Sequence, residues 1–365
     1  MTHPSSPSTR RPARRRLVAA SLTAVLLVPL AACGSSSETD EASDGGTLHL
    51  GMAVANISLN FASSMADGAK QAAAHNTGVK LQVVGPPNTD GPAEQKLFSA
   101  LGQTATDGIV LENLDPPIFT RPSAQLIDSG VPVIALDTSP TDGSKIETYV
   151  GNDNYALGAM LAEQAIERLG DNPTGEIVVG VPNPGTPVLD SRAQGIIDTF
   201  AKEAPGVKAL GPYQTYSDPA QNYGAWQSLV NAHPDALAYL GVGDADSYDL
   251  AKIKQAQKGS YLVAGFDVDA KTLEYVKEGV LFCTLDPEHF LKGYIAMQLL
   301  IDNARGTAAP KGWFETPGLV VDASNIDAIL TRQQSPEDAY SYYEDQIKEL
   351  LADPEAQMKP LEDAR

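Results

Sequence analysis

The stretch Val131-Pro-Val-Ile-Ala-Leu-Asp137 decides the fold that this sequence predicts. It is an unbroken apolar run that ends on a carboxylate, which is typical of a strand buried on both faces of a parallel sheet. Residues 147–154 follow as a second strand that breaks into Gly151-Asn-Asp-Asn154, whose side chains suit the cap of a helix. Because ligands of open α/β sheets bind beyond the carboxyl ends of the strands, Asp137 is expected to face a ligand.

The remaining chain repeats this alternation of strand and helix. Before Gly151, strands are expected at 48–55, 80–85, 108–113, 131–137 and 147–151, and helices at 61–74, 92–105 and 121–129. After it, strands are expected at 176–181, 208–215, 236–242, 261–267 and 280–285, and helices at 155–169, 189–204, 219–232, 247–258, 270–277 and 287–303. The pattern predicts the α/β class, with two doubly wound lobes built on parallel sheets.

Two later segments complete the expected elements. A final strand is expected at 319–321, and Ser335-Pro336 opens an extra C-terminal helix. One apolar stripe on that helix is expected to pack on its parent lobe, although a partner-binding helix is the alternative; the stripe comprises Tyr340, Tyr343, Ile347, Leu350 and Leu351.

The first 46 residues are expected to lie outside the fold. Five arginines precede an apolar stretch, residues 17–29, that is too short to span a bilayer, and Leu30-Ala-Ala-Cys33 follows. This resembles the lipobox of bacterial lipoproteins, so residues 1–32 are predicted to be a signal peptide and Cys33 the lipidated residue. A structural cysteine is the alternative. Residues 33–46 have the composition of a flexible tether, and the export route, Sec or twin-arginine, stays open.

Charge and cysteine content exclude several classes of protein. Loss of residues 1–32 removes five arginines and no acid, which changes the formal net charge from −20 to −25. A surface this acidic repels phosphate backbones, so nucleic acid is not an expected partner. Cys283 is the only other cysteine, which excludes a disulfide framework. The remaining length is sufficient for two hydrophobic cores.

Several motifs occur in an order that resembles the periplasmic sugar-binding proteins of ABC importers, of which the ribose-binding protein is typical. They span roughly residues 48–322 and include Asn60-Phe61, Met65-Ala-Asp-Gly68, Asp107-Gly-Ile-Val110, Val131–Asp137, Gly151–Gly158, Ala232-His-Pro-Asp235 and Val263-Ala-Gly-Phe-Asp267. The resemblance implies two Rossmann-like lobes joined by three hinge crossovers, with a ligand cleft between the lobes. It places residues 47–151 and 286–317 in the first lobe, 152–285 and 318–334 in the second, and leaves 335–365 as a C-terminal extension.

The same resemblance implies a set of ligand-binding residues at strand ends. In the first lobe they are Asn60, Phe61, Asn113, Asp137 and Thr138; further along the chain they are Asp190, Arg192, Tyr216, Asp244, Asp267 and Asp286. Carboxylates and amides bind hydroxyl groups directionally, and the ring of Phe61 can stack on the apolar face of a sugar. The alternatives are helix capping for Asp137 and Asp267, and core packing for Phe61.

Three departures from the ribose-type pattern affect the expected ligand. Thr138 and Asp190 stand where that pattern has arginines, and Ala62 replaces an aromatic residue. The cleft is therefore expected to be acidic and roomy, with Arg192 as its only cation. That arginine has a structural salt bridge as its alternative role. A neutral or weakly cationic ligand fits better than an anionic one.

Enzyme classes receive less support. The chain lacks the glycine-rich dinucleotide fingerprint, the phosphate-binding loop, the Gly-x-Ser-x-Gly elbow and the His-Glu-x-x-His motif. The five histidines fall in unrelated places, and residues 244–249 lack the glycine that a calcium loop needs. No metal and no cofactor are expected. A glycoside hydrolase with paired carboxylates is a distant third reading.

The sequence therefore predicts a substrate-binding lipoprotein that captures a sugar or polyol by hinge closure near Gly151, residues 285–286 and residues 317–318. A membrane-embedded ABC permease is the expected partner, and a monomer anchored outside the cytoplasm through Cys33 is the expected form. An extracytoplasmic solute sensor on the same fold is the alternative. The sequence does not identify the solute.

Overall fold

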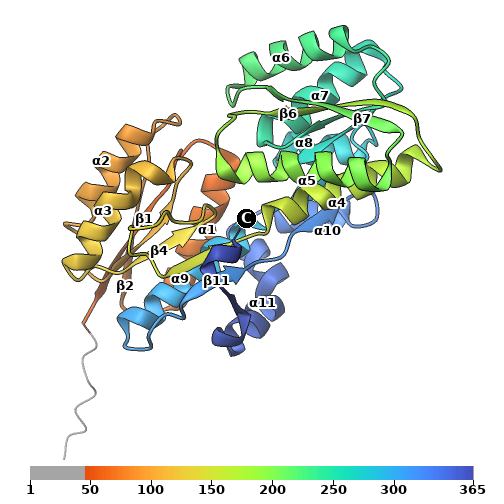
Figure 1. The fold of residues 1–365 in the computed structure, drawn as a ribbon. Coiled ribbons are helices and arrows are strands. Elements are labelled where there is room, and N and C mark those ends of the chain that lie inside the picture. Colours follow the sequence, from red (N-terminus) through yellow and green to blue (C-terminus); the bar gives the residue numbers. More distant parts are fainter. Residues whose placement is uncertain (1–45, 365) are drawn as a thin grey trace, which may run out of the picture. The chain divides into compact units, whose positions relative to one another are not determined.

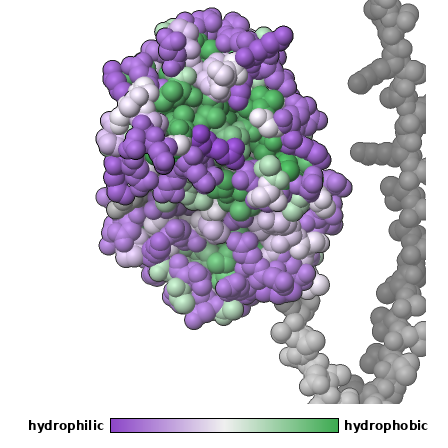
Figure 2. All heavy atoms as spheres, turned by 90° about the vertical axis from the view of Figure 1, so that its right-hand side faces the viewer, coloured by the Kyte–Doolittle hydropathy of each residue, from purple (hydrophilic) through white to green (hydrophobic). Residues whose placement is uncertain are grey.

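The computed structural model describes residues 46–364. The predicted signal peptide, Cys33 and all of the predicted tether except Gly46 lie outside the described residues. Within 46–364, no helix is long and apolar enough to cross a membrane. Hydrophilic residues surround a smaller hydrophobic area on the face drawn in Figure 2.

Seven strands form the sheet of the first lobe, in the order β13-β11-β5-β4-β3-β1-β2. They are β1 (Leu48–Ala53), β2 (Val79–Val84), β3 (Gly108–Glu112), β4 (Val133–Leu136), β5 (Thr148–Gly151), β11 (Gly312–Glu315) and β13 (Met358–Lys359). All neighbours are parallel except β13, which runs antiparallel to β11. The strand β4 lies inside this sheet with all four residues buried, as its unbroken apolar run predicts.

Six strands form the sheet of the second lobe, in the order β12-β10-β9-β8-β6-β7. They are β6 (Gly175–Val181), β7 (Val207–Gln214), β8 (Ala238–Gly241), β9 (Leu262–Phe266), β10 (Thr284–Asp286) and β12 (Leu319–Val321). Only β12 is antiparallel to its neighbour. Because the first five strands of each series have the same spatial order, the predicted fold of two similar doubly wound lobes is confirmed.

Helices cover the faces of both sheets (Figure 1). Those of the first lobe are α1 (Asn60–His75), α2 (Gly91–Leu101), α3 (Pro116–Asp128), α9 (His289–Ala304) and α11 (Pro336–Ala352), of which α11 packs on α1 and α9. Those of the second lobe are α4 (Asn154–Leu169), α5 (Pro187–Glu203), α6 (Pro219–Ala232), α7 (Asp244–Gln257), α8 (Ala270–Lys277) and α10 (Ile326–Arg332). Two short 3₁₀ turns, η1 (Glu355–Gln357) and η2 (Leu361–Asp363), end the described chain.

Glycines let one pair of helices in each lobe approach to backbone contact. A Cβ on Gly68 of α1 would lie 2.0 Å from the carbonyl oxygen of Phe290 in α9, and one on Gly293 would lie 1.9 Å from that of Met65. The pair α4 and α5 repeats this arrangement at Gly158 and Gly195, where the corresponding distances are 2.0 and 2.1 Å. Any larger side chain at these positions would force the helices apart.

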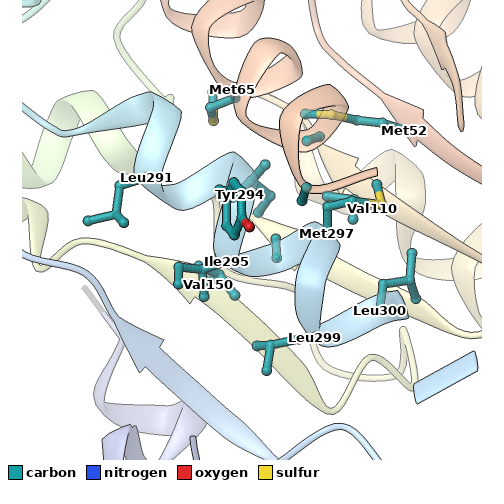
Figure 3. Close-up of a cluster of buried hydrophobic side chains, with 14 of the residues drawn as sticks. Met52, Met65, Val110, Val150, Leu291, Tyr294, Ile295, Met297, Leu299 and Leu300 are labelled. Carbon is teal, nitrogen blue, oxygen red and sulfur yellow. The ribbon is translucent and has the colours of Figure 1, made fainter. Parts of the chain in front are cut away.

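The helix α9, which contacts α1, packs on the first sheet. Figure 3 shows its apolar side chains among residues of β1, β3 and β5. From α9 these are Leu291, Tyr294, Ile295, Met297, Leu299 and Leu300, and from the strands Met52, Val110 and Val150. Since every residue from His289 to Met297 is buried, α9 is an interior helix rather than a surface helix.

Three local predictions differ from the structure. The strand β11 was not expected, because Gly312-Trp-Phe-Glu315 is short and shows no alternation before Pro317. The helix expected at 121–129 begins at Pro116, since a proline is tolerated in the first turn, where its missing N–H is not needed. The strand expected at 280–285 is confined to Thr284–Asp286, because residues 280–283 form bends and turns.

The C-terminal extension adds a fourth crossing to the three that were predicted. Ile326 and Ile329 of α10 pack in the core of the second lobe, whereas Tyr343 and Ile347 of α11 pack in the core of the first. Residues 333–335 therefore connect the lobes. The predicted packing of the α11 stripe on a lobe is confirmed, and β13 then extends the first sheet beyond β11.

Truncation of Ile347 tests how much α11 contributes to the first lobe. Ile347 is 4% exposed inside the core cluster, so Ile347→Ala should lower the free energy of unfolding by about 2–4 kcal/mol. Urea unfolding followed by circular dichroism measures the change. The exposed neighbour Glu349→Ala is the matched control and should have little effect. Equal stability of both variants would show that α11 is not part of this core.

Candidate ligand-binding cleft

Asp137 and Asp267 occupy equivalent places in the two lobes, directly after β4 and β9. Both have left-handed backbones, with φ of 65° and 73°. The Tyr149 hydroxyl donates to the carbonyl oxygen of Asp137 at 2.9 Å, and the Thr284 hydroxyl donates to that of Asp267 at 2.9 Å. A left-handed residue other than glycine costs about 1–3 kcal/mol and persists only where its surroundings hold it. Here neighbouring strands hold both aspartates.

The first turn of α9 supplies a cationic or imidazole partner to each aspartate. Lys292 forms a buried ion pair with Asp137, and its ammonium also donates to Oδ1 of Asn152 at 2.8 Å. Nε2 of His289 lies 2.8 Å from Oδ1 of Asp267. Since His289 and Lys292 are three residues apart, one helical turn joins the polar strand ends of both lobes.

These contacts correct one prediction from the sequence. The histidines were expected to fall in unrelated places, but His289 lies in the cleft against Asp267, with its ring 5.8 Å from that of Phe61. Arg192, the only cation expected in the cleft, is the only lysine or arginine among the described residues that line the cavity described below. Lys292 is a second, fully buried cation that was not expected, bound to the Asp137 carboxylate. A lysine within a largely apolar stretch, residues 290–301, was the available signal.

Electrostatics keep Asp137 ionised in spite of its burial. Burial alone would raise the pKa of this carboxyl group, but the charges of Lys292, His289 and Arg192 lower it to about 2. The 3% exposed Arg192 donates from Nε to the Asn154 side chain at 3.0 Å, and from NH1 to a backbone carbonyl of β8–α7 at 3.1 Å. Its guanidinium lies 4.4 Å from the centre of the Phe266 ring. Arg192 is thus held rigidly at the cavity wall.

A cavity lies over these groups and is lined from both lobes; it is called the inner cavity below. With the open solvent at its mouth it comprises about 630 Å³. Five predicted residues line it, namely Phe61, Asp137, Arg192, Asp244 and Asp267. The other lining residues are Leu59, Leu114, Pro182, Asn183, Val188, Leu189, Ser217, Gly243, Ala245, Tyr248 and His289. Apolar walls with a few convergent polar groups are typical of a small-molecule site.

Asp244, the first residue of α7, differs from the other two acids of the inner cavity. Its Oδ1 is buried and has no hydrogen-bond partner among the described residues. Burial and the neighbouring carboxylates of Asp267 and Asp269 raise its pKa well above the usual range. Asp137 and Asp267 are already paired with α9, so Asp244 is the acid most available to a ligand.

The six remaining predicted residues do not line the inner cavity. Asn60 and Asp286 line a small separate pocket, where Asp286 pairs with Arg332 at 2.6 Å. The amide nitrogen of Gly185 donates to the Asp190 carboxylate, the Thr138 amide donates to the carbonyl of Leu136, and Asn113 lines a small cavity beside α3. Tyr216 lines a second, larger cavity, called the outer cavity below. The ligand-binding role of these six residues stays a prediction.

Two buried glutamates near the cleft were not expected from the sequence. Glu112, the last residue of β3, is fully buried, and its Oε2 accepts from the amide of Ala55 at 2.8 Å. Glu94 of α2 is 2% exposed and lines the outer cavity. Burial, followed by the neighbouring acids, raises the pKa of Glu112 to about 8 and that of Glu94 to about 9. Both are therefore largely protonated at neutral pH.

Metal chemistry receives no support from the described residues 46–364. They contain no group of three or more His, Cys, Asp or Glu side chains arranged to hold a metal ion. The acids of the inner cavity are instead neutralised by α9 or left for a ligand.

Comparison with known proteins identifies the family. Residues 50–308 match the periplasmic binding protein domain, and the chain belongs to this extracytoplasmic family. The resemblance predicted from the motifs is thereby confirmed. The chain is 23% identical to the ribose import binding protein RbsB of Bacillus subtilis over 262 residues, which cover 72% of this chain and 83% of that protein. It is also 23% identical to the xylose/arabinose-binding protein XylF of Sulfolobus acidocaldarius, over only 51% of that protein's length.

Solved structures show the same fold. An ABC transporter solute-binding protein of Burkholderia graminis in complex with D-arabinose superposes with a TM-score of 0.72 at 27% identity, covering 78% of this chain and 98% of that one. A solute-binding protein of Agrobacterium vitis with bound D-fucose gives a TM-score of 0.71 at 22% identity, covering 76% and 96%. These relatives are binding proteins rather than enzymes.

Removal of the Lys292 ammonium tests the α9 ion pair. Lys292→Met leaves Asp137 buried without its counterion, so we expect a loss of about 3–5 kcal/mol in the free energy of unfolding. The double variant Lys292→Met/Asp137→Asn should recover part of this loss, because no unpaired charge remains. Lys311→Met, which breaks an exposed pair with Glu147, is the control. Chemical denaturation measures all three, and a Lys292 effect no larger than the control would refute the pairing.

Stability should fall as the pH rises from 6 to 9. The raised folded-state pKa values of Glu94 and Glu112 mean that the folded protein retains protons that the unfolded chain releases above about pH 5. Their contribution is complete below that pH and is lost as the pH passes about 8–9. Asp137, whose pKa is about 2, adds no slope in this window. Thermal melts of Glu112→Gln should show a flatter profile; an unchanged slope would contradict the assignment.

Proposed function

We propose that this protein captures a sugar or polyol in the inner cavity and delivers it to a membrane-embedded ABC permease. The observation that carries the proposal is the paired arrangement of Asp137 and Asp267, one from each lobe, at a cavity lined by both lobes. Family membership and the sugar complexes of structural neighbours support the same ligand class.

The lining suits polyhydroxylated compounds. The carboxyl group of Asp244 and the amide of Asn183 provide directional acceptors and donors for hydroxyl groups. The rings of Phe61 and Tyr248 offer flat apolar surfaces to the C–H face of a sugar ring. At the bottom of the cavity Asp137 is paired with Lys292 and Asp267 with His289, so neither aspartate needs a cationic ligand.

Hinge closure is the proposed mechanism. Three connections, β5–α4, β10–α9 and β11–β12, pass between the two sheets close to Gly151, Asp286 and residues 316–318. A ligand that contacts both lobes binds the closed form more tightly and shifts the population toward it. We infer lobes of residues 47–151 with 286–317 and of residues 152–285 with 318–334, and a C-terminal extension of residues 335–365.

The proposal includes an anchored, extracytoplasmic form. Residues 1–32 would be removed, Cys33 would carry the lipid, and residues 33–46 would tether a monomeric receptor to the membrane. The motif Leu30-Ala-Ala-Cys33 supports this assignment. We do not propose an enzymatic activity, since the relatives named above are binding proteins. A solute sensor on the same fold is the second candidate, and ligand uptake in a strain that lacks the protein would separate the two.

A ligand screen tests the proposed function. Pentoses, hexoses and polyols should raise the melting temperature, since a ligand at 100 times its dissociation constant adds about 2.7 kcal/mol of stability. For the best ligand, titration calorimetry of Asp244→Ala should show an affinity loss of about 10–100-fold, because the ligand loses a buried hydrogen-bond partner. Glu349→Ala, on the exposed face of α11, is the control and should leave the affinity unchanged. If no compound shifts the melting temperature, the proposed ligand class is wrong.

A further inference from the structure

The inner cavity adjoins the outer cavity, which a single sugar ring held over Asp137 and Asp267 would leave unused. The two cavities share four lining residues, Leu59 and Leu114 from the first lobe and Asn183 and Ser217 from the second. With the open solvent at its mouth, the outer cavity comprises about 1530 Å³, compared with 630 Å³ for the inner one. The two cavities are therefore neighbours, and a ligand longer than one ring has a second cavity beside the first.

The outer cavity is lined by acids and by neutral polar groups. Glu94, Asp115 and Asp218 line it, and no lysine, arginine or histidine is among its described lining residues. Amides and hydroxyls line the remaining wall, which suits further hydroxyl groups; they include Asn56, Asn88, Thr89 and Gln221. Asp218 is occupied, because its carboxylate caps α6 through the amides of Ala220 and Gln221. The acids left for a ligand are thus Glu94 and Asp115.

Glu94 is a buried acid in the wall of this cavity, not an exposed surface residue. It is 2% exposed, and its Oε1 has no hydrogen-bond partner among the described residues. Glu112 lies behind it and also has an unpartnered Oε1. Two neighbouring buried carboxyl groups are unfavourable unless a proton or a cation compensates them, and each group's raised pKa reflects this cost. A cationic group of a ligand would take the place of the proton that otherwise compensates Glu94.

We propose that the natural ligand is an amino-substituted glycoside longer than one ring, whose amino group binds at Glu94. This proposal rests on the proposed function, because the inner cavity takes the terminal sugar. The second unit lies in the outer cavity against Asn56 and Thr89, and its ammonium group faces Glu94 and Asp115. Ligand binding would favour the ionised form of Glu94, so affinity is coupled to release of its proton. The acidic protein, with a formal net charge of −20, also attracts a cationic ligand at long range.

Matched pairs of ligands test this proposal. The probes are amino-substituted disaccharides, each compared with its neutral N-acetylated form and with the corresponding single sugars, by titration calorimetry. We expect at least one amino disaccharide to bind about tenfold more tightly than both its neutral form and its single sugars, with a preference that weakens at high salt. Glu94→Gln and the exposed Asp115→Asn should each reduce that preference, while Glu349→Gln on α11 should retain it.

The outcomes separate this inference from the proposed function. If single sugars bind but no amino disaccharide exceeds its neutral form, the inference is overturned and sugar capture stands. A preference that survives in both Glu94→Gln and Asp115→Asn also overturns it, because the acids would not be the cause. If no sugar of any length binds, the proposed function fails with it. Asp115→Asn keeps the test valid even if the buried Glu94→Gln variant fails to fold. The Asp115 side chain is exposed and caps no helix in the structure, so its replacement should not disturb folding.

Discussion

The first turn of α9 holds the charges of both lobes in one place, and the cleft depends on that contact. Lys292 and His289 reach Asp137 and Asp267, which stand at equivalent strand ends with left-handed backbones. A buried ion pair contributes little net stability, but loss of one partner leaves an uncompensated charge in a low-dielectric interior. The contacts of Lys292 and His289 therefore fix the positions of Asp137 and Asp267 more than they add to the stability of the fold. They fix which atoms of the two aspartates remain free to face the inner cavity.

Close helix packing explains why α9 can perform this role. Gly68 and Gly293 allow α1 and α9 to touch at the backbone, and Gly158 and Gly195 do the same for α4 and α5. These contacts leave no room for adjustment, so α9 has a single position over the first sheet. Its apolar residues occupy the core, and His289 and Lys292 in its first turn reach the strand ends. Small residues in the sequence thus determine packing, and packing determines the geometry of the site.

The sequence predicted those parts of the structure that local patterns encode. The apolar run that ends at Asp137 predicted a buried strand and a residue facing the cavity, and the repeated order of elements predicted the second lobe. It could not predict that Lys292 meets Asp137, because 155 residues separate them and no local period reports such a contact. Strand β11 was missed because two adjacent aromatics carry no alternation, and its neighbour in the sheet is remote in sequence. Glu94 and Glu112 were missed because acids in a sequence are ordinarily exposed.

The connector between α10 and α11, the fourth crossing, would limit how far the two lobes separate in the proposed hinge motion. Arg332 at the end of α10 binds Asp286 at 2.6 Å and the Tyr343 hydroxyl of α11 at 2.6 Å, so it fastens the connector to the β10–α9 hinge. The connector itself has three residues and reaches at most roughly 10 Å when fully extended. The end of α10 and the start of α11 must therefore stay close together beside the β10–α9 hinge. If the lobes move as proposed, this connection would restrict their separation on its own side of the cleft, and a ligand would enter from the opposite side.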